Sequence, residues 1–275
     1  MRILVANDDG VNAPGVRLLA DAARAISADV WIVAPERKWT AASHQLTFDR
    51  TLTLSRIDEH VYACSGAPAD CVIAAMTVVM ADEPPALVLA GINDKANVGE
   101  DLAYSGTTAI AREGAFWGVP AISVSRTDTA TGKDDRGTIR QDDRRATGQD
   151  NRRTIGQDDR DAIAQLLAGL WSRRALWAHD GCWLGVNLPA VLPAPLATAR
   201  VSRDKIGSAV DILERSADRI AYRLRRGRPG STVEGDENAR LAAGAATVLL
   251  FCWNTQVPLA DGVLGSPVVG DKMAD

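Results

Sequence analysis

The sequence predicts an α/β fold in which helices cover both faces of a mostly parallel sheet. Residues 1–125 alternate short β-branched runs with longer amphipathic stretches, as βαβ units do. With 275 residues, the chain is long enough to bury a large core without disulfide or metal support. A content of 46% hydrophobic and 24% charged residues is typical of a globular protein and excludes collagen-like and wholly disordered chains.

Four short apolar runs are predicted to be the strands of this sheet, at residues 3–6, 30–34, 86–90 and 121–124. Between them, apolar residues recur at helical spacing and predict two helices, each with one buried face. These residues are Val16, Leu19, Ala20, Ala23 and Ile26 in the first helix and Val72, Ala75, Met76 and Val79 in the second. Residues 46–56 alternate apolar and polar positions, which predicts an antiparallel strand from a hairpin inserted into the sheet.

Residues 134–165 repeat an octad with acid, Arg and Gln in fixed places, as DDRGTIRQ, DDRRATGQ, DNRRTIGQ and DDRDAIAQ. Between residues 131 and 160 the only hydrophobic residues are Ile139, Ala146 and Ile155, too few to offset the entropy of ordering the backbone. An octad also matches neither the heptad nor the hendecad of a supercoiled helix. Residues 129–160 are therefore interpreted as a disordered low-complexity insertion, with a charged tether for a partner as the alternative.

The part of the chain after the insertion, residues 161–275, is predicted to complete the α/β core that begins in residues 1–128. A helix is predicted at residues 161–175, with an inward face formed by Ile163, Leu166, Leu167 and Leu170. Strands are predicted at residues 183–188, 197–201, 220–224 and 246–253. Their order in the sheet does not follow from the pattern.

Charge and composition restrict the class of function. A formal net charge of -4 provides no basic surface for a nucleic-acid backbone, so duplex binding is not expected. No apolar run reaches the roughly 18 residues of a membrane helix, and Asp8 interrupts the start of the chain where a signal peptide would continue. A cytoplasmic location without membrane attachment is therefore expected. Without a C-x-x-C pair or nearby His ligands, four cysteines are interpreted as reduced core thiols: Cys64, Cys71, Cys182 and Cys252.

Two adjacent carboxylates, Asp8 and Asp9, follow the first predicted strand in the motif NDDG at residues 7–10. In an open parallel sheet, ligands bind outside the carboxyl ends of the strands. Adjacent carboxylates repel unless a cation neutralises them, and such hard oxygen ligands suit Mg²⁺, Mn²⁺ or Ca²⁺. The motif therefore indicates a divalent-metal site, and a plain Asp-Gly turn is the alternative.

Three further polar segments have the same placement or lie next to it. GINDKANVG at 91–99 follows a predicted strand, and its amides suit a hard cation or an oxyanion. YSGTT at 104–108 opens a helix, where free N–H groups favour phosphate. A plain loop and a plain N-cap are the respective alternatives. APER at 34–37 leads to His44, and a single histidine is more often a satisfied residue than a catalyst.

These motifs together resemble the SurE family of survival-protein nucleotidases. The matching segments are NDDG at 7–10, APER at 34–37 with Ser43, SGAPADCV at 65–72, GIN at 91–93 with NVG at 97–99, and YSGT at 104–107, with an echo in GVNLP at 185–189. The resemblance implies a Rossmann-like core with a β-rich C-terminal extension that helps to form a homodimer or homotetramer. It also implies a divalent-metal-dependent phosphatase of nucleoside 5′- and 3′-monophosphates.

Residue by residue, the resemblance assigns a Mg²⁺ or Mn²⁺ ion to four ligands, Asp8, Asp9, Thr40 and Asn93. It assigns the substrate phosphate to Ser105, Gly106 and Thr107, with Asn97 nearby. A bound cation and the N–H groups of this turn would offset charge on the phosphate and the leaving group. Asp8 and Asp9 are also the catalytic candidates, by attack on phosphorus or by activation of water.

Several positions depart from the family pattern. Thr40 and Ala41 stand where members usually have Ser and Gly, and Asp94-Lys95 stands where Arg-Gly is common. Lys95 places a flexible cation beside the site, where it either contacts the substrate phosphate or points into solvent. Beyond residue 189 the family features are reduced to remnants such as Tyr222 and VPL at 257–259.

Two other functional classes are weighed against a nucleotidase. The departures keep open a SurE-like protein that binds metal and nucleotide with weak or no turnover. A response-regulator receiver domain also has paired acids after its first strand. It needs a phosphoacceptor Asp at the end of its third strand and a Lys-Pro pair, and the sequence has neither.

Overall fold

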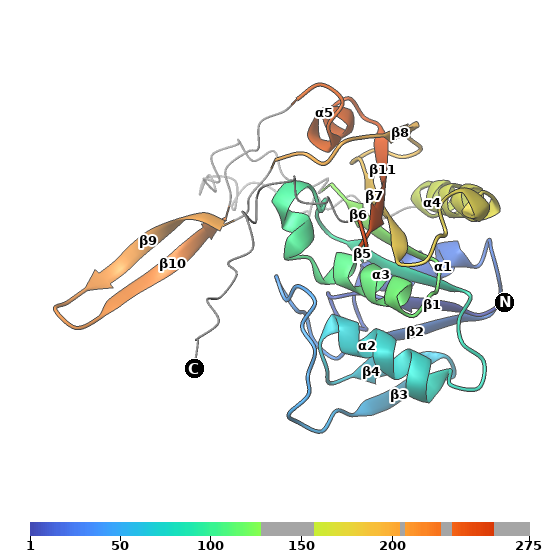
Figure 1. Cartoon of the computed structure of the whole chain (residues 1–275), viewed down its shortest axis with the longest axis horizontal. Helices are drawn as coiled ribbons and strands as arrows, with labels where there is room; N and C mark the ends of the chain where they lie inside the picture. The colour runs from blue at the N-terminus through green and yellow to red at the C-terminus, as the bar shows by residue number, and fades with distance from the viewer. Residues whose placement is uncertain (128–156, 204–206, 227–232, 256–275) are drawn as a thin grey trace, which may run out of the picture.

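A computed structural model describes residues 1–127, 157–203, 207–226 and 233–255 of the chain (Figure 1). Within these residues, nine strands form one sheet in the order β3-β4-β2-β1-β5-β6-β7-β11-β8. Pairing is parallel from β4 through β7, and it is antiparallel where β3 meets β4 and where β11 meets β7. The predicted α/β fold with a mostly parallel sheet is confirmed.

The elements have the following bounds. The strands of the sheet are β1 (Ile3–Ala6), β2 (Val30–Pro35), β3 (Leu54–Asp58), β4 (Val61–Cys64), β5 (Leu87–Asn93), β6 (Ala121–Arg126), β7 (Cys182–Leu188), β8 (Leu196–Thr198) and β11 (Ala246–Cys252). The helices are α1 (Pro14–Ala23), α2 (Pro68–Ala74), α3 (Gly106–Phe116), α4 (Gln157–Ser172) and α5 (Glu237–Ala242), with η segments at Ala75–Val79, Gly99–Ala103 and Arg174–Leu176. A separate hairpin consists of β9 (Gly207–Arg215) and β10 (Ile220–Arg226).

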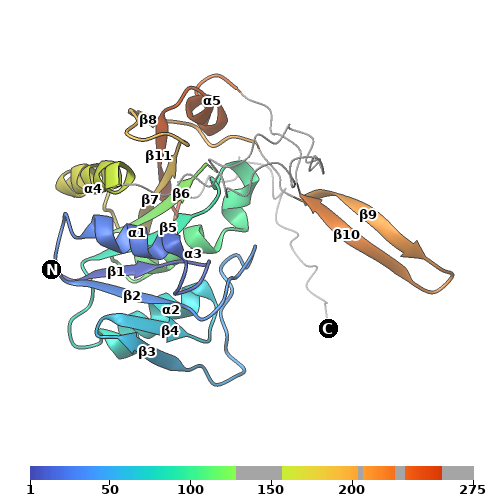
Figure 2. The same ribbon diagram turned by 180° about the vertical axis from the view of Figure 1, so that it is seen from behind.

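The helices cover opposite faces of the sheet and bury two separate cores (Figures 1 and 2). Leu19 of α1 and Leu167 of α4 pack on one face with Ile3, whereas Ile110 of α3 packs on the other face with Leu4. Because successive side chains of a strand point to opposite faces, β1 contributes to both cores and is buried throughout. The predicted apolar faces of the first two helices are the buried ones.

The strand predicted at residues 46–56 is shorter in the structure. It begins only at Leu54, and it forms the predicted hairpin with β4. The N–H of Thr47 donates to Asp70 and the N–H of Thr53 donates to the Ser65 hydroxyl. Side chains therefore accept the hydrogen bonds that the carbonyl groups of a neighbouring strand would accept in a sheet, and the segment before Leu54 is not a strand.

Helix α4 begins at Gln157, before the predicted end of the insertion. Asp159, in the fourth octad, is 3% exposed, and its two carboxylate oxygens accept from the two Arg126 Nη atoms at 3.2 Å each. Ile163 and Leu167 of the same helix are buried, as predicted. Residues 157–160 are therefore part of helix α4, and Asp159 is buried. The rest of the predicted insertion, residues 129–156, lies outside the described residues, as do residues 257–259.

Two of the four cysteines form a disulfide, so the prediction of four reduced thiols is wrong for this pair. Cys182 of β7 and Cys252 of β11 are cross-strand partners with a Cα–Cα distance of 4.1 Å. Their separation of 70 residues hid the contact from the sequence, because only the pairing of β7 with β11 brings them together. Cys64 and Cys71 are free and buried, as predicted.

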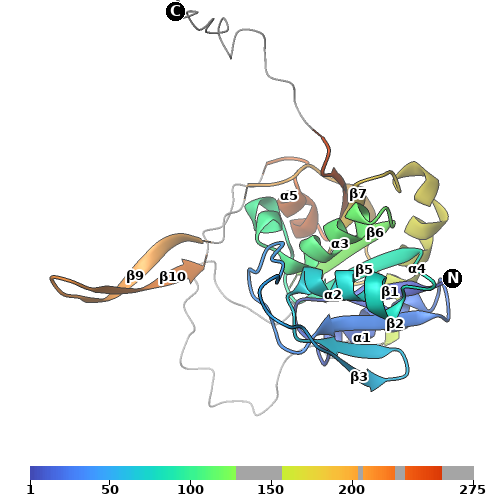
Figure 3. The same ribbon diagram turned by 60° about the horizontal axis from the view of Figure 1, so that its bottom comes forward.

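The β9–β10 hairpin extends away from the sheet in all three views (Figures 1, 2 and 3). Its register places Val210 opposite Leu224 and Ile212 opposite Tyr222. These four side chains lie on one face of the hairpin, and all are exposed, by 46% to 68%.

In the described part of the chain, the helices are too short or too polar to cross a bilayer.

Candidate metal and phosphate site

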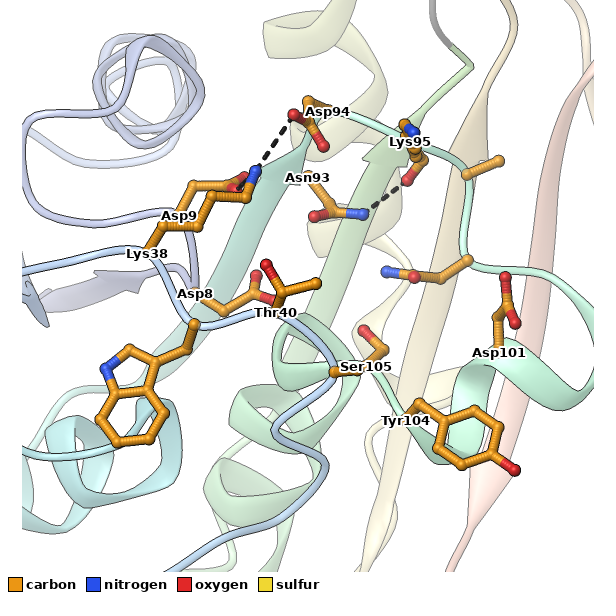
Figure 4. Close-up of a pocket in the computed structure, with 14 residues that line it drawn as sticks. Asp8, Asp9, Lys38, Thr40, Asn93, Asp94, Lys95, Asp101, Tyr104 and Ser105 are labelled. Carbon is orange, nitrogen blue, oxygen red and sulfur yellow. Dashed lines mark hydrogen bonds and ion pairs between the residues drawn. The ribbon is translucent and has the colours of Figure 1, made fainter. Parts of the chain in front are cut away.

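The predicted polar segments meet at the carboxyl ends of β1, β2 and β5. These strands are parallel neighbours, so the loops that follow them open at one edge of the sheet. A pocket at this edge contains seven of the nine predicted site residues (Figure 4): Asp8, Asp9, Thr40, Asn93, Lys95, Asn97 and Ser105. The two others, Gly106 and Thr107, lie behind the pocket wall, in contact with Asp8.

Asp8 is the buried carboxylate of the pocket. The residue is 8% exposed, and the Thr107 hydroxyl donates to its Oδ1 at 2.5 Å. Burial raises the pKa of Asp8 to about 6, the Thr107 hydrogen bond acts against this rise, and the charge of Asp9 adds to it. A carboxylate that is costly to ionise in this way gains most from a cation placed beside it.

The start of α3 holds Asp8 in place. The hydroxyl of Ser105 accepts from the Thr108 N–H at 3.0 Å and caps the helix. A Cβ at position 106 would lie 2.8 Å from the Asp8 Cβ, so this close approach requires glycine. The sequence assigned Thr107 to a phosphate-binding turn, whereas the structure directs its hydroxyl to Asp8. The N–H groups of Gly106 and Thr107 lie in the first turn, where an α-helix offers no carbonyl partner.

Asp9 forms an ion pair with Lys38, a residue that the sequence analysis did not select. The Lys38 Nζ contacts Asp9 Oδ1 and lies 3.2 Å from Asp94 Oδ2, so it links the loops after β1, β2 and β5 (Figure 4). Partial burial lowers the pKa of Lys38, but the contacts with Asp9 and Asp94 outweigh burial and raise it. Lys38 therefore supplies a fixed positive charge beside the acid pair.

The donor atoms of the pocket fit a hard divalent cation. The Asn93 Nδ2 donates to the Lys95 carbonyl at 2.6 Å, which leaves Oδ1 on the side of the acid pair (Figure 4). Two carboxylates, this amide oxygen and the Thr40 hydroxyl form an all-oxygen set that leaves positions for water or phosphate. In the described ranges, no three His, Cys, Asp or Glu side chains are grouped to hold a metal. A cation in this pocket would be held by the neutral oxygens of Thr40 and Asn93 as well as by Asp8 and Asp9.

The loop that carries Thr40 has a strained backbone. Ala41 and Ser43 have φ values of 54° and 52°, in the left-handed region that costs a non-glycine residue about 1–2 kcal/mol. Ser43 fixes this loop to the segment before α3, because its N–H donates to the Tyr104 carbonyl at 2.9 Å and its hydroxyl to the Ala103 carbonyl at 2.7 Å. The glycine expected at position 41 from the resemblance would relieve the strain.

His44 belongs to a side-chain network outside the pocket. Its Nε2 lies 2.6 Å from Glu113 Oε2, and its Nδ1 accepts from the Arg112 Nε at 2.7 Å. Both ring nitrogens are thus engaged, which confirms the interpretation of His44 as a satisfied histidine.

Lys95 and Asn97 lie on the same loop in different surroundings. Lys95 is exposed at the rim, whereas Asn97 is half-buried. The Asn97 Nδ2 donates to the Ser125 hydroxyl at 2.9 Å, and the Asn97 backbone is held by Asn187 of β7. Asn187 is the asparagine of the GVNLP segment, so the structure explains why this distant motif accompanies the others.

Comparisons with known proteins identify relatives of the chain. The model of the family described as survival protein SurE matches residues 3–208. A 5′-nucleotidase SurE from Paramagnetospirillum magneticum is 36% identical over 265 residues, covering 92% of this chain and 90% of the relative. One from Methylocella silvestris is 47% identical over 134 residues, covering 49% of this chain and 53% of the relative.

A solved structure extends the likeness to the fold. The crystal structure of the SurE protein from Aquifex aeolicus matches with a TM-score of 0.71 at 26% identity, covering 93% of this chain and 95% of that chain. The family model spans well over half of the residues, and the first relative aligns over nearly the whole of both proteins. The chain therefore belongs to the SurE family.

Proposed function

We propose that this chain is a 5′-nucleotidase, a phosphomonoesterase that releases phosphate from nucleoside 5′-monophosphates and also from 3′-monophosphates. The observation that carries the proposal is the pocket in which Asp8, Asp9, Thr40 and Asn93 meet in front of the first turn of α3. The name 5′-nucleotidase SurE, given to the relatives from P. magneticum and M. silvestris, supports the same activity.

The chemistry follows from the barrier that a phosphate monoester presents. Its anionic oxygens repel a nucleophile. Asp8, Asp9, Thr40 and Asn93 would hold Mg²⁺ or Mn²⁺, which would supply positive charge that reduces this repulsion. Ser105 and the N–H groups of Gly106 and Thr107 orient the phosphate. Asp8 is ionised above its pKa of about 6. It either attacks phosphorus, which breaks the bond to the nucleoside oxygen and gives an acyl phosphate that water then hydrolyses, or accepts a proton from a water that attacks phosphorus and displaces the same oxygen. Thr107 fixes the direction of this carboxylate.

The proposal is tested by phosphate release from 5′-AMP and 3′-AMP, before and after removal of metal with EDTA. We expect activity on both substrates, with loss in EDTA and recovery on addition of Mn²⁺ or Mg²⁺. Undiminished turnover in excess EDTA would contradict the metal site. Activity confined to one isomer would remove the other from the proposal.

A binding protein with weak turnover is the second candidate function. It is favoured by the contact between Lys38 and Asp9, because the lysine occupies an oxygen that an ion would use. The same assay separates the two candidates when nucleotide binding is measured alongside by calorimetry. Tight binding without phosphate release would identify the second candidate.

We further propose that the protein is a homodimer or homotetramer in which the β9–β10 hairpin meets a second copy. An isolated two-stranded hairpin is marginally stable in water, and the exposed face with Val210, Ile212, Tyr222 and Leu224 is apolar. A two-fold axis would place this face against its own copy. Light scattering should give a multiple of 29.2 kDa for the wild type and 29.2 kDa for Ile212→Arg. A monomeric wild type would contradict the assembly.

The cytoplasmic location expected from the sequence stays a prediction. The Cys182–Cys252 disulfide weighs against it, because reducing compartments keep most protein thiols reduced. Free-thiol labelling of the protein in freshly lysed cells measures whether Cys182 and Cys252 are reduced or joined in a disulfide. Reduced cysteines would agree with a cytoplasmic location, and a disulfide would argue against it.

A further inference from the structure

A buried polar network behind the pocket joins three distant parts of the chain. Asn97 comes from the loop after β5, Asn187 from β7 and Glu237 from the start of α5. The Asn97 N–H donates to Asn187 Oδ1 at 2.9 Å, and Asn187 Nδ2 donates to the Asn97 carbonyl at 3.0 Å. Asn187 Nδ2 also donates to Glu237 Oε1 at 3.1 Å. The network thus connects the C-terminal segment to a residue that lines the pocket.

The backbone of Asn97 determines the direction of every hydrogen bond in this network. Its N–H needs an acceptor and its carbonyl needs a donor, so Asn187 must direct Oδ1 to the first and Nδ2 to the second. The second N–H of Nδ2 is then free to donate to another acceptor, and Glu237 Oε1 accepts this hydrogen bond. Asn97 lies in the loop beyond β5 and pairs with no strand of the described sheet. The Asn187 side chain makes the two backbone hydrogen bonds that such a strand would make.

Glu237 is held at the other end of the network by donors alone. It is 0% exposed, and its Oε2 accepts from the N–H groups of Gly99 at 3.4 Å and Ser202 at 3.3 Å. Burial raises the pKa of Glu237 above its ordinary value, and the hydrogen bonds from these N–H groups and from Asn187 offset only part of this rise. Because each hydrogen-bond partner of Glu237 in the described part of the chain is a donor, the carboxylate form satisfies the site better than a protonated form, which would direct an O–H at an N–H. No cation is bonded to Glu237 among the described residues. The carboxylate therefore acts in this network as a hydrogen-bond acceptor.

We propose that Asn187 and Glu237 are positioning residues that hold the loop from Asn97 to Gly99 in the conformation that binds the substrate phosphate. The inference rests on the proposed function, because it takes Asn97 as a phosphate contact. It goes beyond that function by making the site depend on the C-terminal segment that carries α5. Neither Asn187 nor Glu237 lines the pocket next to the acid pair, so neither is a catalytic residue.

Loss of the network should affect binding more than chemistry. A loop that is competent for only a tenth of the time weakens apparent affinity about tenfold, since the apparent Kd equals the intrinsic Kd divided by the competent fraction. Once substrate has selected the competent loop, Asp8 and its surroundings are unchanged. We therefore expect Asn187→Ala to raise KM for 5′-AMP about tenfold and to change kcat less than about twofold.

Exchange of the two functional groups provides a sharper test than deletion. In Asn187→Asp alone, two carboxylates face each other, and in Glu237→Gln alone, an NH₂ group faces the N–H groups of Gly99 and Ser202. In the double variant Asn187→Asp/Glu237→Gln, the new glutamine amide donates to the new aspartate carboxylate and turns its oxygen to Gly99 and Ser202. Total charge and volume are retained, and only the Asn97 carbonyl loses its donor. We expect each single variant to raise KM and the double variant to recover part of the loss.

Thr247→Val is the matched control. Thr247 pairs with Asn187 across β11 and β7, is 0% exposed, and has a hydroxyl without a hydrogen-bond partner within the described chain. It reports the effect of altering a buried polar side chain beside the network without breaking it. Its KM should equal that of the wild type.

The experiment measures KM and kcat for 5′-AMP, the Kd of 5′-AMP by calorimetry, and hydrogen exchange of a peptide that contains residues 97–99. We expect faster exchange at residues 97–99 in both single variants, with partial recovery in the double variant. Equal KM, Kd and exchange in wild type and Asn187→Ala would overturn the inference while leaving the nucleotidase intact. A wild type that releases no phosphate would defeat the proposed function, and Kd and exchange would then decide the inference alone. Additive losses in the double variant would also overturn it.

Discussion

At the scale of a single residue, burial of the Asp8 carboxylate in the candidate site lowers the stability of the folded protein at neutral pH. Its carboxylate is buried with a pKa of about 6, against an ordinary value of 3.8, so the folded protein holds this proton more tightly than the unfolded chain does. Stability from this group is present at low pH and is lost as pH rises from about 3.8 through about 6. A difference of about 2 units at about 1.4 kcal/mol per unit corresponds to roughly 3 kcal/mol at neutral pH.

Asp8→Asn should therefore stabilise the metal-free protein at pH 8 by about 1–3 kcal/mol, because asparagine still accepts from Thr107 but carries no charge to bury. Near pH 4 the gain should nearly vanish. Thermal or urea unfolding in EDTA at both pH values measures the difference. Asp21→Asn, at a carboxylate that is 55% exposed, is the control with little expected change. A variant less stable than wild type at pH 8 would contradict the assignment.

Sequence reasoning found residues whose role follows from local pattern and missed those whose role needs a distant partner. Asp8, Asp9 and Asn93 follow predicted strands, so their meeting at one sheet edge was predictable. Lys38 lies in a loop, and its two partners come from other segments, so no pattern marks it. Thr107 was placed correctly at a helix start, but its hydrogen bond to Asp8 depends on how closely α3 approaches β1.

At the scale of elements, the loop after β1 and the first turn of α3 meet in close contact at the candidate site. Gly106 allows the first turn of α3 to touch Asp8, and the sequence predicted both elements from their patterns. The sequence missed β4 and β9. The strand β1 is as short as β4 but was found because a helix follows it, whereas β4 follows β3 without a helix between them. The strand β9 pairs only with β10 and lies outside the strand–helix alternation of the main sheet.

Gly106→Ala should lower kcat/KM by at least about tenfold, because the added Cβ would lie 2.8 Å from Asp8 Cβ and 3.0 Å from its Oδ2 and must displace the carboxylate. The overpacking should also lower stability by about 1–3 kcal/mol. Gly169→Ala is the control, since its Cβ would meet only Arg173 Nη1 at 3.6 Å on α4. Steady-state kinetics and thermal unfolding compare the two. Equal kcat/KM in Gly106→Ala and wild type would show that the contact is unimportant.

At the scale of the whole molecule, the octad repeat divides into a folded part and a part outside the described residues. The pattern itself is uniform, and the sequence placed the start of the helix at residue 161, inside the fourth copy, whereas α4 begins at Gln157. The difference lies in the partners: Asp159 meets the buried Arg126, and Ile163 and Leu167 meet the core. Tertiary contacts therefore set where α4 begins, and the disorder predicted for the remaining octads stays a prediction.

Deletion of residues 134–149, the first two octads, should leave the melting temperature within about two degrees and kcat/KM unchanged, because loop length changes stability only slowly. Asp159→Ala should by contrast cost about 3–5 kcal/mol, since it leaves Arg126 buried without its carboxylate. Calorimetry and phosphate release on both variants make the comparison. A deletion that lowers the melting temperature by many degrees would show that the removed octads pack.

The central claim is that Asp8 and Asp9 hold the ion on which phosphate release depends. The most direct test compares Asp9→Asn with Asp94→Asn, because both carboxylates contact Lys38 and only Asp9 belongs to the acid pair. Their side chains are 11% and 65% exposed. Mn²⁺ binding by electron paramagnetic resonance and phosphate release from 5′-AMP should both fall about a hundredfold or more in Asp9→Asn, about 3 kcal/mol, and only a few fold in Asp94→Asn. Retained Mn²⁺ binding and turnover in Asp9→Asn, or equal losses in the two variants, would contradict the account.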